Sequence, residues 1–127
     1  SAEVTVSIEA GPWHAAAVGA VRQLDDATVI SWSIVEGPAM VTVQWGPTET
    51  GGDAWMAGTE SEMIEAVVTL DETTPNRWVM TGLLHELGHV GGIDHNDEER
   101  SVMNATDVPW RRYQPVDLDA LAAVDCR

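Results

Sequence analysis

Three histidines and one glutamate, His85, Glu86, His89 and His95, lie close together in the sequence at spacings that suit a single metal ion. On a helix, the rings of His85 and His89 leave the same face and can bind one ion. Glu86 is well placed to hold a water molecule on that ion. Gly92 can end the helix and turn the chain, so that His95 approaches the same ion. Three protein ligands leave a fourth position open, which is typical of a catalytic zinc site.

A solvated helix face is the alternative interpretation of these polar residues. It does not explain why a pair of glycines, Gly91 and Gly92, directly precedes a third histidine. The segment also lies at the end of an expected amphipathic helix, which is the context that a His-Glu-x-x-His motif requires. We therefore favour the metal site.

Composition bounds the fold and the partners. With 127 residues, of which 44% are hydrophobic and 21% charged, the chain is expected to form one compact globular domain. No apolar run has the length of a membrane span, so no membrane insertion is expected. The formal net charge of −15 disfavours nucleic acid and anionic membranes as partners. A lone cysteine, Cys126, is interpreted as an idle thiol, since it has no partner for an internal disulfide.

Hydrophobic periodicity and turn residues predict the secondary structure. The predicted strands span residues 4–9, 30–35, 39–45, 54–59 and 65–70, with a turn at 36–38 between the second and the third. The predicted helices span residues 13–24, 74–90 and 116–124. Most strands precede most helices after the first, so the sequence predicts an α+β fold with a mixed sheet.

The pattern His-Glu-x-x-His-x-x-Gly-x-x-His, followed by Met103, resembles the signature of the metzincin clan of zinc endopeptidases. The residues around it look most similar to the matrixins, the matrix-metalloproteinase-like branch. This resemblance implies a zincin-like fold, with a mixed twisted sheet packed on two long helices and a short C-terminal helix after a Met-turn. It further implies a single catalytic domain over residues 1–127, with an upper part at 1–92 and a small lower part at 93–127.

The resemblance assigns roles to the motif residues. His85, His89 and His95 would bind one catalytic Zn²⁺, which lowers the pKa of a bound water from about 16 toward 7. Glu86 would be the general base that accepts the proton of this water as it attacks a peptide carbonyl. Met103 would form a hydrophobic floor beneath the metal.

The resemblance also implies a substrate cleft. An extended peptide would pair with an edge strand at residues 54–59, against Trp55, Met56, Ala57 and Gly58. A specificity pocket would be walled by the residues that follow the Met-turn. The candidates for this wall are Val108, Pro109, Trp110 and Tyr113.

Some features depart from the larger matrixins. The loop at 46–53 is short and has no histidine, so we expect no second zinc. Acidic residues could bind calcium, but a solvated acidic surface is the better explanation, so calcium is not supported. These residues are Asp53, Asp71, Glu72, Asp97 and Glu98. Residues 104–106 replace the family's usual residues after the Met-turn. The chain would thus be a minimal, bacterial-type version.

The resemblance leads to a secreted, monomeric zinc endopeptidase that acts on peptides or proteins. Two alternatives stay open. One is an amidase or cell-wall peptide hydrolase that uses the same site, and the other is a catalytically silent peptide-binding module. The presence of Glu86 with all three histidines argues against the silent module.

Overall fold

The computed structural model describes residues 3–58, 63–106 and 108–124, which form five strands and three helices. The strands are β1 (Glu3–Ile8), β2 (Ser31–Ile34), β3 (Val41–Trp45), β4 (Gly52–Gly58) and β5 (Met63–Leu70). The helices are α1 (His14–Ala27), α2 (Asn76–Val90) and α3 (Pro115–Val124). Cys126 and Thr59 lie outside the described residues.

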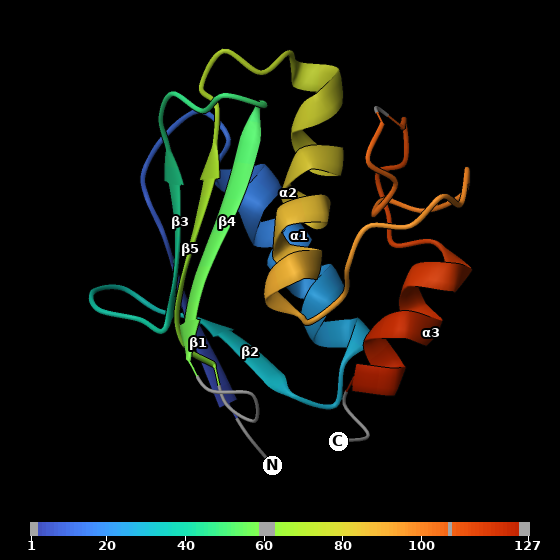
Figure 1. The fold of residues 1–127 in the computed structure, drawn as a ribbon. Helices are drawn as coiled ribbons and strands as arrows, with labels where there is room; N and C mark the ends of the chain where they lie inside the picture. The colour runs from blue at the N-terminus through green and yellow to red at the C-terminus, as the bar shows by residue number, and fades with distance from the viewer. Residues whose placement is uncertain (1–2, 59–62, 107, 125–127) are drawn as a thin grey trace.

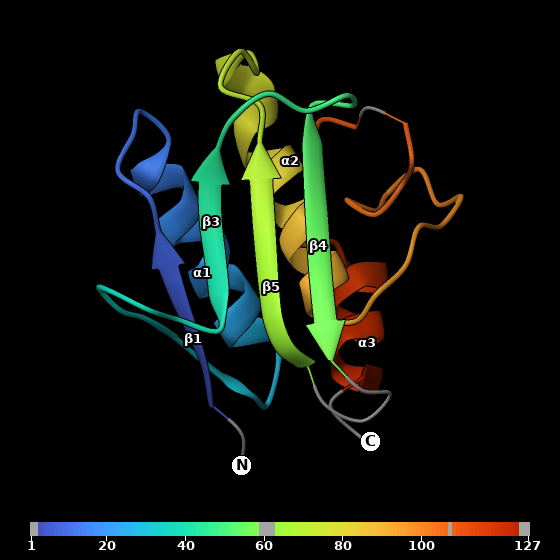
Figure 2. The same ribbon diagram turned by 60° about the vertical axis from the view of Figure 1, so that its left-hand side comes forward.

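The five strands form one mixed sheet in the order β2-β1-β3-β5-β4. β1 pairs in parallel with β2 and β3, and β3 pairs in parallel with β5. β4 runs antiparallel to β5 and forms one edge of the sheet, beside α2 (Figure 2). The prediction of an α+β fold with a mixed sheet is confirmed, and so is the prediction of an edge strand that covers most of residues 54–59.

The helices α1 and α2 cover one face of the sheet, and α3 lies beyond the C-terminal end of α2 (Figure 1). In α1, a stripe of small and aliphatic residues is buried: Ala17, Ala20, Val21 and Leu24. In α2, the buried stripe includes three fully buried leucines, Leu83, Leu84 and Leu87. Each such leucine contributes roughly 1.5–3 kcal/mol through burial. The same burial that stabilises α2 directs its opposite face, with His85 and Glu86, toward the cleft described below.

The chain between β2 and β3 differs from a hairpin. The sequence predicts a turn at residues 36–38, and Gly37 does have a positive φ of 86°. However, β1 lies between β2 and β3, so the two strands do not pair with each other. The connection instead crosses β1, where the N–H of Val35 donates to the carbonyl of Val6 at 2.9 Å.

Within the described residues, no helix is both long and apolar enough to span a membrane.

Candidate metal centre

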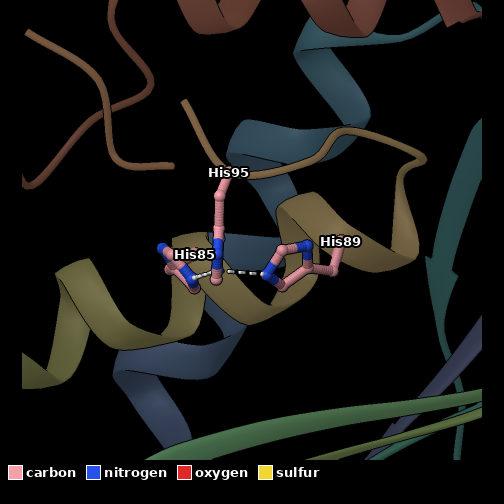
Figure 3. Close-up of side chains that lie close together, drawn as sticks. All are labelled: His85, His89 and His95. Carbon is pink, nitrogen blue, oxygen red and sulfur yellow. Dashed lines mark hydrogen bonds between the residues drawn. The ribbon is translucent and has the colours of Figure 1, made fainter. Parts of the chain in front are cut away.

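The end of α2 brings the three histidines together. His85 and His89 lie one turn apart on the helix, and His95 enters from the loop that follows (Figure 3). The helix ends at Gly91, and Gly92 adopts a φ of 99°, which favours glycine. The N–H of Ile93 then donates back to the carbonyl of Gly88 at 3.0 Å, so the chain reverses tightly. The predicted role of Gly92 as the residue that turns the chain is confirmed.

The three Nε2 atoms converge on one point. The Nε2 of His95 lies 3.0 Å from that of His85 and 3.1 Å from that of His89 (Figure 3). Ligand nitrogens of a tetrahedral zinc ion are separated by about 3.3 Å, since each lies roughly 2.0–2.1 Å from the metal. The spacing of the three nitrogens therefore fits a zinc ion with little movement.

Hydrogen bonds fix which ring nitrogens face one another. The Nδ1 of His85 lies 2.7 Å from the carbonyl oxygen of Val102, and the Nδ1 of His89 lies 3.0 Å from that of Ile93. A carbonyl can only accept, so both Nδ1 atoms must carry the proton. In the neutral rings, the Nε2 atoms then present lone pairs to each other and to His95. A cation bound among the three rings would stabilise this arrangement, and such carbonyl partners are usual for metal-binding histidines.

Burial keeps the first two rings in the form that binds a metal. Burial is the largest cause that lowers the pKa of His85 and of His89, and the neighbouring histidines lower both further. Hydrogen bonds to Val102 and Ile93 act in the opposite direction. Only a neutral imidazole binds a metal ion, so the lowered pKa lets both rings bind a metal at a lower pH than an ordinary histidine would.

Glu86 lies on the same helix and faces the start of β4. A Cβ built at Gly52 would be 3.0 Å from the Oε2 of Glu86, so the carboxylate packs directly against this strand. Burial and, to a smaller extent, the negative charge of Asp53 together raise the pKa of Glu86 to about 7. A carboxyl group that titrates near neutral pH can both accept and return a proton.

Met103 lies beneath the helix that carries the histidines. Its side chain is fully buried. A Cβ at Gly88 would come within 2.6 Å of its sulfur, so the absence of a side chain at Gly88 makes room for the methionine. Met103 thus packs against the turn of α2 that joins His85 to His89.

A cleft of about 480 Å³ opens above the histidines. It is lined by residues 50–54, which lead into and begin β4, and by residues of α2 between Trp78 and His89. Beyond α2 it is lined by Val102, residues 104–106 and Val108. Of the predicted substrate-binding residues, only Val108 is among those that line this cleft. Trp55, Met56, Ala57 and Gly58 follow the lining part of β4, with Trp55 and Met56 half-exposed at 50% and 45%.

Two of the other predicted pocket residues, Trp110 and Tyr113, make hydrogen bonds away from the cleft. Tyr113 is buried, and its hydroxyl donates to the carbonyl of Leu84 at 2.9 Å. The indole N–H of Trp110 donates to the carbonyl of Glu99 at 2.8 Å, and the carbonyl of Trp110 accepts from Thr81. Pro109 is exposed and does not line the cleft. Pro109, Trp110 and Tyr113 are thus not among the residues that line this cleft, and their part in a specificity pocket stays a prediction.

The acidic residues considered as calcium ligands do not form a cluster like that of the three histidines in the described part of the chain. In the described part of the chain, the group of three or more ligand-type side chains close enough to hold a metal ion is His85, His89 and His95. Asp71 uses its carboxylate to accept from the N–H of Thr48 and from the N–H and hydroxyl of Thr73. These hydrogen bonds lower its pKa.

Four residues of the site were not assigned to it from the sequence, although Asp53 was named there among the acidic residues considered for calcium. Gly52 and Asp53 adjoin Glu86, and Ser101 and Asp117 hold the turn that contains Met103. Glycines and acidic residues are frequent in this chain, and none of these four belongs to a motif. Only their positions in the fold distinguish them.

The fold is similar to those of several solved structures. One structure of myroilysin aligns with a TM-score of 0.72 at 12% identity, covering 99% of this chain and 84% of that one. A second structure of myroilysin gives 0.54 at 18% identity, covering 86% and 54%. A chain in the GM1-bound form of the ECX AB5 holotoxin gives 0.67 at 10% identity, covering 97% and 80%. At these identities the likeness concerns the fold alone.

No family model matches the chain, and no curated protein matches it in sequence. The fold likeness to myroilysin and the cluster of three histidines are two separate observations. Together they give an α+β fold that holds a site able to bind a metal ion, with properties consistent with zinc.

Proposed function

We propose that this protein is a zinc-dependent endopeptidase of the metzincin type, similar to the matrixins. The observation that carries the proposal is the convergence of the Nε2 atoms of His85, His89 and His95, with two of the Nδ1 atoms tied to carbonyls. The fold likeness to myroilysin supports it. The cleft beside the edge strand β4 supports it as well.

His85, His89 and His95 would hold the metal through neutral rings. A zinc ion bound there would make a water molecule more acidic and would offset the negative charge that develops on the peptide oxygen. The carboxylate of Glu86 accepts the proton that the attacking water loses. It then returns this proton to the nitrogen of the leaving amine, so the proton balance closes within the site.

The edge of the sheet supplies a means of binding a peptide. The outer backbone groups of β4 have no strand beside them in the sheet order. An extended peptide can therefore pair with β4 and lie across the cleft. Gly52, Asp53 and Ala54, which line the cleft, are better placed for this than the later residues of the strand.

Metal content and cleavage of casein or of a peptide library would test the proposal together. The expected result is one zinc per chain, cleavage that a chelator abolishes, and cleavage that added zinc restores. Glu86→Gln should bind the metal and lose most of the activity. Glu65→Gln, which removes an exposed carboxylate from β5, is the matched control and should cleave normally.

Two results would contradict the proposal. A wild-type protein that binds one zinc yet cleaves no peptide would favour the binding-module alternative. Cleavage that survives complete removal of the metal would exclude the mechanism.

A further inference from the structure

A buried carboxylate lies behind the metal centre, near the start of α3. Asp117 is only 1% exposed. Its carboxylate accepts three hydrogen bonds, from the hydroxyl of Ser101 at 2.5 Å, from the N–H of Val102 at 3.1 Å and from the N–H of Gln114 at 2.8 Å. Two of these donors belong to the turn that precedes Met103.

The peptide groups of Val102 connect this carboxylate to a metal-binding histidine. The N–H of Val102 donates to Asp117, and the carbonyl of Val102 accepts from the Nδ1 of His85 at 2.7 Å. Val102 itself is fully buried. The orientation of this one residue therefore sets the position of the carbonyl oxygen that accepts from the Nδ1 of His85.

Ser101 connects the same carboxylate to the chain that carries His95. Its hydroxyl donates to Asp117 and accepts from the side-chain amide of Asn96 at 2.9 Å. It also accepts from the N–H of Met103 at 2.9 Å. Asn96 directly follows His95, and its own N–H donates to the carbonyl of Met103 at 3.2 Å.

We propose that Asp117 is a positioning residue of the metal centre, which holds the rings of His85 and His95 in the geometry that binds the metal. It acts on His85 through Val102 and on the segment after His95 through Ser101 and Asn96. Its donors are two backbone N–H groups and one hydroxyl, so within the described contacts its charge is not neutralised by an ion pair.

The burial of a charge supports this role. An ionised carboxylate without a counter-ion is costly in the protein interior. A neutral side chain that accepts hydrogen bonds would be enough to hold a turn, so the turn alone does not explain the carboxylate. A nearby metal cation would compensate a negative charge at Asp117 through His85.

The inference rests on the proposed function only for the assignment of His85 and His95 as metal ligands. Its test is therefore the affinity for Zn²⁺, measured by competition with a chromophoric chelator, and not peptide cleavage. Asp117→Asn and Ser101→Ala should each weaken Zn²⁺ binding by roughly tenfold to a hundredfold, the usual effect of removing such an outer partner. Asp119→Asn, two residues further along α3 and exposed, should bind Zn²⁺ like the wild type.

A second control separates positioning from general stability. Val6→Ala removes buried side-chain volume from β1, and Val6 is fully buried but takes no part in this network. It should lower the melting temperature of the metal-free protein without weakening Zn²⁺ binding. If Asp117→Asn fails to fold, Ser101→Ala decides the question, since it removes the link between Asp117 and Asn96 without changing the charge.

Nitrogen NMR of the histidine rings in the metal-free protein gives an independent measure. In the wild type, the Nδ1 of His85 should carry the proton. In Ser101→Ala, the ring should exchange between the two tautomers. The inference is overturned if folded Asp117→Asn or Ser101→Ala binds Zn²⁺ as tightly as Asp119→Asn. Weakened Zn²⁺ binding in a protein that cleaves no peptide would instead uphold this inference while the proposed function fails.

Discussion

The backbone of Gly52 lies directly against the carboxylate of Glu86, at a distance that leaves no room for a side chain. A Cβ at position 52 would be 3.0 Å from the Oε2 of Glu86 and 3.3 Å from its Cγ. The edge strand β4 and the helix α2 are therefore in contact at the group that the proposed mechanism uses as a base. The position of this carboxylate depends on a residue that is far from it in the sequence.

Gly52→Ala should displace Glu86 and lower the kcat for peptide cleavage by about tenfold or more, since positioned proton transfer contributes roughly 10²–10⁴-fold to such reactions. Zn²⁺ affinity should stay unchanged, because the substitution does not touch a histidine. Gly46→Ala is the matched control, since its Cβ would lie 3.8 Å from Thr69, which is an ordinary contact. Equal activity of the two variants would contradict the proposed role of the contact.

Gly88→Ala should destabilise the protein, although alanine is normally preferred to glycine inside a helix by about 1 kcal/mol. The new Cβ would lie 2.6 Å from the sulfur of Met103, which is fully buried and cannot swing away freely. We expect a loss of roughly 1–3 kcal/mol in the free energy of unfolding, measured with denaturant. In α1, Gly19→Ala would meet only Met80 at 3.5 Å and should be neutral or stabilising. A stabilised Gly88→Ala would show that Met103 does not fix this site.

The raised pKa of Glu86 predicts a pH-dependent cost in stability for the metal-free protein. Its pKa is raised from 4.5 to about 7, mainly by burial, so the folded state binds this proton more tightly than the unfolded state. Its contribution to stability is present below pH 4.5 and is lost as the pH rises through 7. Glu86→Gln should therefore stabilise the metal-free protein at pH 8, by an amount on the order of 2 kcal/mol.

The matched measurement compares the free energy of unfolding of wild type and Glu86→Gln from pH 4 to pH 8. The histidines titrate in both proteins, so their effects cancel in the difference. The advantage of Glu86→Gln should shrink as the pH falls through about 7 toward 4.5. A difference that does not change with pH would show that the carboxyl group has an ordinary pKa.

The order of the elements and the group of three histidines could be predicted from the sequence, because both leave local patterns. Alternating residues in β1 and the buried stripe of α2 are visible in windows of a few residues. The spacing of the three histidines, with Gly92 between the last two, is likewise a local pattern. All four residues lie near the end of one helix or directly after it. Sheet order is different, because β1 pairs with β2 and β3 across long connections that leave no local pattern.

Within the site, too, the features that could not be predicted from the sequence depend on contacts between distant segments. Asp117 and Asp119 lie two residues apart on α3 and have similar neighbours, yet one is 1% exposed and the other is at the surface. The predicted edge strand is present as β4, but the part of β4 that borders the cleft is set by how α2 lies against it. The hydroxyl of Tyr113, a candidate for the pocket wall, donates to the carbonyl of Leu84 in the core.

We expect that one metal ion, held by the three histidines, is required for peptide hydrolysis. The most direct measurement titrates Zn²⁺ into the metal-free protein while following cleavage of a peptide library. Activity should rise in proportion to bound zinc and saturate at one ion per chain, and His89→Ala should show neither the saturable zinc binding nor the activity. Activity in the metal-free protein, or one bound zinc with no cleavage at saturation, would contradict it.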